Sequence, residues 1–356
     1  MERVYFIIGC TASGKGAVGR ALAKRIGGQI VSVDSMKIYR RMDIGTAKPP
    51  PEVRAEIPHH CIDIAEPSER FSVARYIEHA DKAIGAIRAA GAVPLAVGGT
   101  SLYLKALTEG LFEVKGGAAD PKVRAGLAAR ADAEGLAVLH KELAAADPAA
   151  AARIHPNDRK RIIRALEVYA LTGRPISQLQ AQWEGWAVTG GGNDSRSAGG
   201  EDRRTGGGEE DPSVCAGSLL PSSSPPFLPS SSHRRYDCVI IGLRREKADL
   251  SRRINLRVRK MAAAGLRDEV ARLLAEPAGI APQAAQAVGY AEMIDHIRGR
   301  CGYDEALERI KVNTRRLAKK QRTWQRRFRD VIWIDVSGEE FVDEAVDQIL
   351  AKAELR

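Results

Sequence analysis

The stretch GCTASGKG, from Gly9 to Gly16, decides how this chain of 356 residues folds. It matches the phosphate-binding template G-x-x-x-x-G-K-[S/T] except at its last position, where Gly16 replaces the hydroxyl residue. The apolar run VYFIIG (4–9) precedes it and is typical of a central parallel strand. Helical spacing follows from Lys15 up to Gly27 and Gly28. A strand, a glycine-rich loop and a helix in this order predict a phosphate-binding loop.

Strands and helices continue to alternate in both halves of the chain. QIVSVDS (29–35), AVPLAVGGT (92–100), YDCVIIGL (236–243) and VIWIDV (331–336) indicate buried strands. Helices are expected from about Val73 to Ala90 and near Glu339 to Ala351. The predicted fold class is α/β, with a parallel-sheet core like that of P-loop NTPases.

Lys15, Asp34 and Thr100 each follow the end of a predicted strand. In parallel sheets, ligands bind at the carboxyl ends of the strands. We therefore expect these three residues on one rim of the sheet.

The middle of the chain has a different pattern. Alanine-rich segments with helical periodicity run from about Asp120 to Gln182 without a strand signal. The Gly/Ser/Pro-rich stretch that follows cannot bury enough apolar surface to offset its ordering entropy. The predicted domains are 1–115 (core, first part), 116–186 (all-helical insertion), 187–235 (disordered segment) and 236–356 (core, second part).

Positive charge is concentrated in two places. The net charge is +10, and nine Lys or Arg without an acidic residue lie between Lys311 and Arg329, on a predicted helix. Leu317, Trp324 and Phe328 offer this helix an apolar stripe towards the sheet. A second cluster, Arg159, Lys160, Arg161 and Arg164, begins a helix of the insertion. A polyphosphate backbone held between core and insertion would balance both clusters.

Other classes are disfavoured by what the sequence lacks. No apolar run approaches the roughly 18 residues of a membrane helix. The five cysteines form no C-x-x-C pair, which favours free thiols in a reducing cytoplasm.

Single residues leave alternatives open on spacing alone. Asp34 fits a magnesium ligand, a general base or a helix N-cap. Thr100 fits a substrate contact or a simple hydroxyl turn. Arg253 and Arg257, four apart on a predicted helix, fit a phosphate fork or a surface ion pair.

Seven motifs occur in a fixed order along the chain: GCTASGKG (9–16), VSVDSMKIYRRMDIGTAKP (31–49), PHHCIDIAEPSERFSVARY (58–76), PLAVGGTSLYLKALTEGL (94–111), ARIHPNDRKRIIRALEVY (152–169), QAVGYAEM (286–293) and TRRLAKKQRTWQRR (314–327). Together they resemble the tRNA dimethylallyltransferase, or tRNA isopentenyltransferase, family over the whole chain outside the Gly/Ser/Pro-rich segment. The resemblance implies transfer of a dimethylallyl group from dimethylallyl diphosphate to N6 of adenosine 37, next to the anticodon, in tRNAs that read codons starting with U. The products are N6-dimethylallyladenosine and diphosphate.

The resemblance also implies roles for individual residues. Asp34 is the expected general base, and Thr100 is expected near the reaction centre. The diphosphate site is expected to comprise Gly9, Thr11, Ala12, Ser13, Gly14, Lys15, Gly16 and Arg253. The expected tRNA contacts are Asp34, Ser35, Met36, Lys37, Thr100, Arg159, Lys160, Arg161, Gln286, Gly289 and Tyr290.

Gly16 departs from the family, which usually has Thr or Ser there. We expect Mg²⁺ as cofactor, held through diphosphate oxygens and water because the loop offers no hydroxyl. A small-molecule kinase and an adenylate isopentenyltransferase remain as alternatives, although neither explains two basic clusters. Gly16 favours a third alternative, a catalytically inactive RNA-binding protein. The resemblance suggests a monomer.

Overall fold

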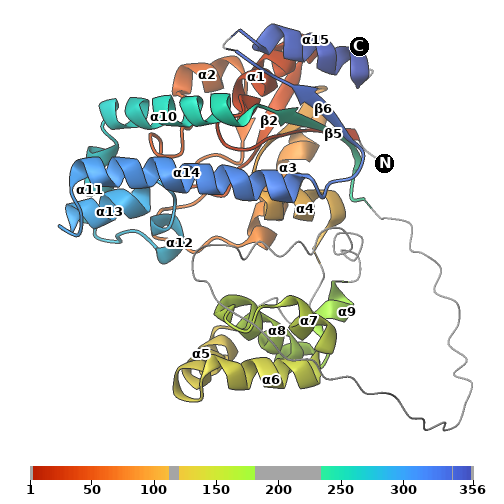
Figure 1. Cartoon of the computed structure of the whole chain (residues 1–356). Helices are drawn as coiled ribbons and strands as arrows, with labels where there is room; N and C mark the ends of the chain where they lie inside the picture. Colours follow the sequence, from red (N-terminus) through yellow and green to blue (C-terminus); the bar gives the residue numbers. More distant parts are fainter. Residues whose placement is uncertain (1–2, 112–119, 181–233, 339, 354–356) are drawn as a thin grey trace, which may run out of the picture.

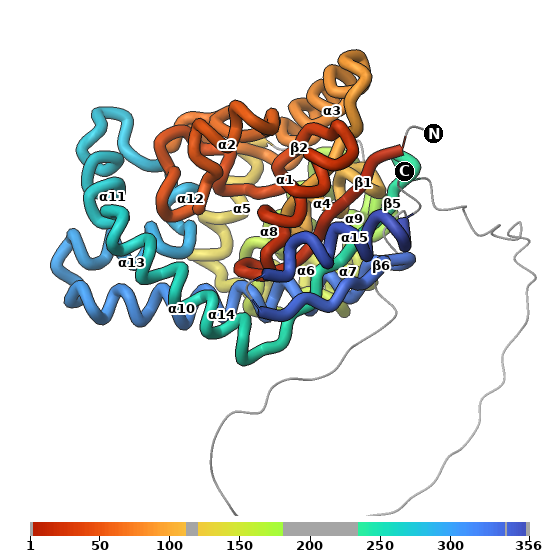
Figure 2. Tube along the Cα trace, turned by 90° about the horizontal axis from the view of Figure 1, so that it is seen from above, coloured from red at the N-terminus to blue at the C-terminus, as the bar shows by residue number. Residues whose placement is uncertain are grey.

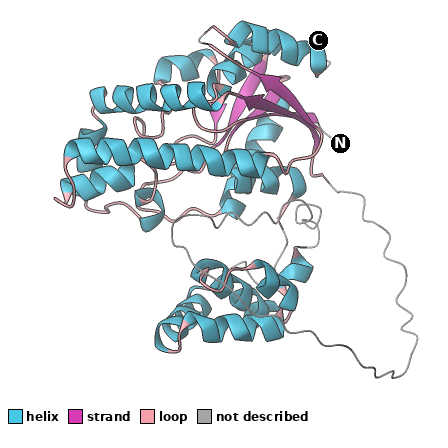
Figure 3. Cartoon of the chain, in the orientation of Figure 1, coloured by secondary structure: helices cyan, strands magenta, loops and turns pink. Residues whose placement is uncertain are grey.

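The strand before the phosphate loop lies in the middle of a parallel sheet (Figure 3). The structure is a computed structural model that describes residues 3–111, 120–180, 234–338 and 340–353. Six strands form the sheet, in the order β3 (His59–His60), β2 (Gly28–Val33), β4 (Val93–Gly98), β1 (Arg3–Ile8), β5 (Asp237–Arg244) and β6 (Val331–Asp335). All pairings are parallel, which confirms the predicted fold class.

Both faces of β1 are covered. Phe6 and Ile8 pack into one hydrophobic cluster, while Tyr5 and Ile7 pack into the cluster on the opposite face. Because neither face meets solvent, the strand is apolar at successive positions instead of alternating. Helices α1 (Lys15–Ile26) and α15 (Val342–Lys352) cover the second face. Helices α3 (Val73–Ala89) and α4 (Ser101–Glu109) cover the first (Figure 1).

The second half of the core adds a helical layer beside the sheet. It comprises α10 (Lys247–Ala263), α11 (Leu266–Ala275), α12 (Pro282–Ala285), α13 (Tyr290–Ile297) and α14 (Tyr303–Gln325). Seen from above, α10 and α14 run alongside each other, and α2 (Pro51–Glu56) lies near α1 (Figure 2). None of the described helices is long and apolar enough to cross a membrane.

Three details differ from the sequence-based expectations. The edge strand β3 was not predicted, because two residues give no periodic signal. Helix α14 ends at Gln325, so three of the nine basic residues lie beyond it. Its predicted apolar stripe is wrong at Leu317, which is 38% exposed, and right at Phe328, which is in the core.

The inserted helices pack on one another around their own core. They are α5 (Pro121–Ala133), α6 (Leu136–Ala146), α7 (Pro148–Arg153), α8 (Arg159–Thr172) and α9 (Ile176–Leu179). Leu139, Leu143 and Ile162 are fully buried at the centre of this cluster. Asp120 caps α5 and Asp158 caps α8 through their side chains. The predicted disordered segment 187–235 lies outside the described residues except at 234 and 235.

A buried carboxylate fixes the loop that follows β2. Glu269 accepts hydrogen bonds from the backbone N–H groups of residues 43, 44 and 45, at 2.8 to 3.2 Å. The Tyr290 hydroxyl also donates to Glu269, at 2.5 Å, and Tyr290 is fully buried.

We expect Tyr290→Phe to lower the free energy of unfolding by about 1.5–3 kcal/mol, as loss of a hydrogen bond to a buried charge does. Chemical denaturation followed by circular dichroism measures this. Tyr303→Phe is the matched control, because no described hydrogen bond involves that hydroxyl. Equal stability of both variants would contradict the assignment.

Candidate active site

The phosphate loop passes from β1 into α1 through Gly14, which has a φ of +99°. A Cβ at this position would lie 2.3 Å from the ring of Phe341, at the start of α15. Only glycine fits, because the backbone is left-handed and the ring leaves no space. Behind Gly14, the N–H groups of Lys15 and Gly16 are in the first turn of α1, where the helix has no acceptor for them. They form an anion-binding helix start.

Gln321 of α14 holds the front of the loop. Its Oε1 accepts a hydrogen bond from the Thr11 backbone N–H at 2.7 Å, and its Nε2 donates to the Gly99 carbonyl at 3.0 Å. A Cβ on Gly99 would lie 2.8 Å from that Nε2. Sequence reasoning missed Gln321, because it is one polar residue within a run of basic ones.

Two predicted members of the diphosphate site are engaged internally. The Thr11 N–H donates its hydrogen bond to Gln321, and Thr11 is only 9% exposed. Ser13 is fully buried, and its N–H donates to the Cys10 carbonyl. These residues shape the loop, while Gly14, Lys15 and Gly16 line the cavity.

Two arginines fix the loop from the side of β5 and α10. Arg253 donates through Nε to the Ala12 carbonyl at 3.1 Å, and Arg245 donates to the Ser13 carbonyl at 3.4 Å. Both guanidinium groups lie over the Phe341 ring, at 5.4 and 4.4 Å from its centre. The structure thus brings the predicted Arg253 to the loop and adds Arg245 and Phe341, which the sequence did not single out.

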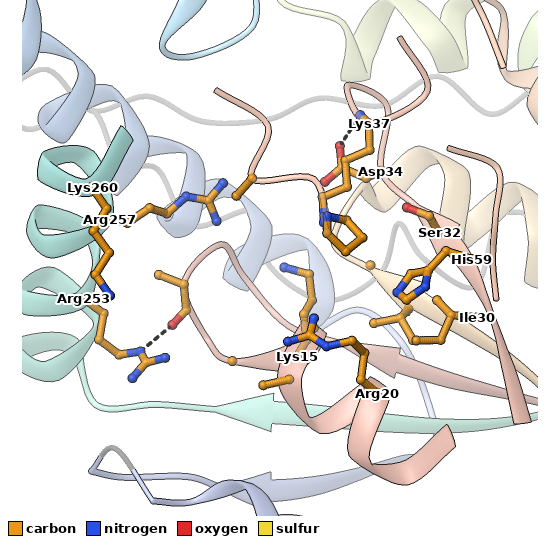
Figure 4. A pocket seen from close by; sticks show the side chains of 18 of the residues that line it. Lys15, Arg20, Ile30, Ser32, Asp34, Lys37, His59, Arg253, Arg257 and Lys260 are labelled. Atoms are coloured by element: carbon orange, nitrogen blue, oxygen red, sulfur yellow. Dashed lines mark hydrogen bonds between the residues drawn. The ribbon is translucent and has the colours of Figure 1, made fainter. Parts of the chain in front are cut away.

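A cavity of about 950 Å³ opens in front of the loop (Figure 4). Among its lining residues, Asp34 is the one carboxylate. Its apolar lining includes Ile30, Ile62 and Val97. Eight basic side chains also line it: Lys15, Arg20, Lys37, Arg252, Arg253, Arg257, Arg259 and Lys260. Such a cavity suits a strongly anionic ligand with a small apolar part.

Burial changes the acidity of two lysines in this cavity. Removal from water lowers the pKa of Lys37 to about 8, against the opposing attraction of Asp34. The same two influences act on Lys15, and the net effect lowers its pKa. An anion that enters the cavity stabilises the positively charged form of both lysines.

Asp34 has one engaged and one available oxygen. Its Oδ1 accepts the backbone N–H groups of Met36 and Lys37, at 2.9 and 3.3 Å. The capping role is therefore real, yet no described hydrogen bond reaches Oδ2. Thr100 Oγ1 accepts the Ser35 N–H at 3.0 Å. Thr100 thus supports the turn that carries Asp34.

Protein ligands for a metal are few. Asp34 Oδ2 is the one carboxylate oxygen of the cavity without a backbone donor, and Gly16 supplies no hydroxyl. Within the described ranges, no group of three His, Cys, Asp or Glu residues is positioned to hold an ion. A metal held mainly by protein side chains does not fit this cavity.

The remaining predicted RNA contacts divide into exposed and buried residues. Lys160, Arg161 and Gln286 are exposed. Arg159 is half-buried and pairs with Asp132, so part of its role is structural.

Gly289 is buried at the start of α13, and the Tyr290 hydroxyl is bound by Glu269. The Tyr290 side chain is therefore engaged inside the protein, and the RNA contact expected at Gly289 and Tyr290 stays a prediction.

We expect Gln321→Ala to weaken binding of dimethylallyl diphosphate about tenfold or more, because the loop loses its support from α14 and a buried N–H loses its acceptor. Isothermal titration calorimetry measures this, with Gln348→Ala on α15 as control. Unchanged affinity in Gln321→Ala would show that the loop keeps its shape without α14.

We also expect affinity for dimethylallyl diphosphate to fall as the pH rises through about 8. Lys37 carries its positive charge below that pH and loses it above, so the cavity becomes less attractive to an anion. Titrations between about pH 7 and 9.5 test this. Lys37→Arg should hold its affinity across the range, and an identical decline in that variant would assign the effect elsewhere.

Comparisons with known proteins agree with this geometry. The family model described as IPP transferase matches residues 37–195 and 220–328, and that described as Isopentenyl transferase matches 2–57. A protein of Geobacter metallireducens named tRNA dimethylallyltransferase is 41% identical over 94% of this chain and 93% of its own length. One of Symbiobacterium thermophilum with the same name is 39% identical over 97% and 92%.

Solved structures show the same architecture. The tRNA isopentenylpyrophosphate transferase of Bacillus halodurans superposes with a TM-score of 0.61 and 35% identity, covering 99% of this chain and 97% of that one. A eukaryotic dimethylallyltransferase acting on tRNA has a TM-score of 0.75 at 22% identity, covering 99% and 79%, and shows the shared fold. The six-stranded parallel core, the cationic cavity and these matches place the chain in the IPP transferase family.

Proposed function

We propose that this protein transfers the dimethylallyl group of dimethylallyl diphosphate to N6 of adenosine 37 in tRNAs that read codons starting with U. The observation that carries the proposal is the cavity itself. There the open N–H groups of the phosphate loop and eight basic side chains face a single carboxylate, Asp34. The names of the relatives, tRNA dimethylallyltransferase, support the same activity.

The reaction forms one bond and breaks one. Adenine N6 attacks the allylic carbon of the donor, and the bond from that carbon to the diphosphate oxygen breaks. Asp34 Oδ2, which accepts no described hydrogen bond, takes the proton that N6 loses. Oδ1 keeps its two backbone hydrogen bonds, which hold the carboxylate in place during the transfer.

The leaving diphosphate gains negative charge as the bond breaks. Lys15 and the first N–H groups of α1 lie where that charge develops, and Arg253 is fixed on the loop carbonyl of Ala12. Donors that are already oriented stabilise the transition state without reorganisation. Ile30, Ile62 and Val97 give the five-carbon group an apolar wall.

The acceptor base has to leave its stack to reach this cavity. Its N6 lies within the anticodon loop, so the enzyme extrudes the base and holds the backbone through phosphate contacts. Exposed basic residues of α14, Arg316, Lys319 and Lys320, and Lys160 of the insertion suit that role. A small-molecule kinase or an adenylate isopentenyltransferase would not need these surfaces.

We infer that Mg²⁺ accompanies the donor and is held through diphosphate oxygens and water. The four described cysteines are free thiols, which suits the cytoplasm.

We expect Asp34→Asn to slow transfer by about 10²-fold or more while both substrates still bind, because the amide keeps the capping geometry and loses the base. Single-turnover transfer of labelled dimethylallyl to an anticodon stem-loop measures this. Asp347→Asn, a carboxyl on α15, is the control. A near-normal rate in Asp34→Asn would exclude Asp34 as the base, and no transfer by folded wild-type protein would exclude the proposed function.

A further inference from the structure

Gly16 leaves an open place at the start of α1, and one side chain lies next to it. A Cβ built on Gly16 would meet Arg20 Nη1 at 3.6 Å, an ordinary van der Waals distance. Among the described residues, no other atom outside the adjoining backbone of α1 and the two chain neighbours lies within 4 Å of it. Arg20 is one helical turn further along α1, so both residues share a face of the helix. The Arg20 guanidinium lies in the cavity beside Lys15 (Figure 4). The space next to Gly16 is thus lined by a cation.

Arg20 has no hydrogen bond or ion pair within the described part of the chain. Glu56 of α2 is the acidic residue that influences it, but this carboxylate pairs with Lys24 at 2.7 Å. Arg20 is half-buried, and removal from water lowers its pKa. It also lies close enough to Lys37 and His59 to lower the pKa of each. A partly desolvated guanidinium among other cations is unfavourable until an anion joins them.

The place next to Gly16 is where a phosphate loop normally holds a hydroxyl and, through it, a magnesium ion. Here the hydroxyl is missing, and the cavity offers a single carboxylate to a metal. A guanidinium presents two parallel N–H donors that match two phosphate oxygens.

We propose that Arg20 binds the diphosphate of the prenyl donor directly, beside the first turn of α1, and so takes over charge neutralisation that the loop hydroxyl and its metal supply elsewhere. The inference rests on the proposed function, because it takes the donor to be a diphosphate ester. Its consequence is that this protein binds its donor with a reduced need for Mg²⁺. Gly16 and Arg20 then form one unit, in which the small residue gives the guanidinium access to the phosphates.

Binding of dimethylallyl diphosphate, measured by calorimetry in EDTA and across a Mg²⁺ titration, tests this without relying on turnover. We expect wild-type protein to bind the donor in EDTA and Arg20→Leu to lose about 10-fold or more of that affinity, as loss of a charged hydrogen bond does. Saturating Mg²⁺ should reduce the difference in donor affinity between wild-type protein and Arg20→Leu. Arg20→Lys keeps the positive charge but lacks the two parallel N–H donors of the guanidinium. Its donor affinity in EDTA should lie between those of wild-type protein and Arg20→Leu.

Arg25→Leu is the matched control, because Arg25 is an exposed arginine of the same helix that pairs with Asp347. Its affinity should equal that of the wild type. Gly16→Thr combined with Arg20→Leu should gain more donor affinity from added Mg²⁺ than Arg20→Leu alone does, since the new hydroxyl supplies a ligand for the metal. Thermal unfolding of each variant confirms that it is folded.

Affinity of folded Arg20→Leu within twofold of wild type in EDTA would overturn the inference. So would wild-type protein that binds the donor only when Mg²⁺ is present. If either of these results is found and wild-type protein still performs the transfer, the proposed function stands and only the proposed role of Arg20 is excluded. Absence of both donor binding and transfer in wild-type protein would overturn both.

Discussion

The hydrogen bond from the Thr11 N–H to Gln321 joins parts of the chain that are 310 residues apart. Through its second bond to Gly99, Gln321 ties the phosphate loop to the end of β4 and to α14 at once. Phe341 supports the same loop from α15, and Arg253 holds it from α10. The shape of the loop therefore depends on the complete core, and the anion site exists only when both halves of the sheet have assembled.

Sequence reasoning recovered the sheet because its central strands are buried on both faces. Continuous apolar runs such as that of β1 have few alternatives to a parallel strand. The rim prediction followed from topology: Lys15, in the loop after β1, and Asp34, directly after β2, line one cavity. Thr100, the third residue of that prediction, is not among the lining residues and accepts the Ser35 N–H instead. β3 was not predicted, because its two residues form a strand through pairing with β2 and are too few to show a sequence pattern. The helical insertion was found from its change of periodicity.

The residues that orient the site were harder to predict. Arg245 and Phe341 act through tertiary contacts, and nothing in their local sequence marks them. Tyr290 lies in a motif that the family resemblance assigns to RNA, yet its hydroxyl binds the buried carboxylate of Glu269. Leu317 was predicted to pack against the sheet, yet this leucine within a basic helix is 38% exposed to solvent. Helical periodicity gives the faces of a helix, whereas only the packed neighbours decide which face is inside.

The order of strands in the sheet also bears on how the protein is made. β1 lies between β4 and β5, and its Arg3 pairs with Asp237 of β5 across 234 residues. At ordinary translation speeds the ribosome needs roughly ten seconds or more to supply that partner. During this interval the apolar central strand has one unpaired edge, and closure of the sheet requires a contact of very high sequence separation. The helical insertion is synthesised within that interval and has its own core, so a chaperone that met this nascent chain would find a finished helical domain attached to an open sheet.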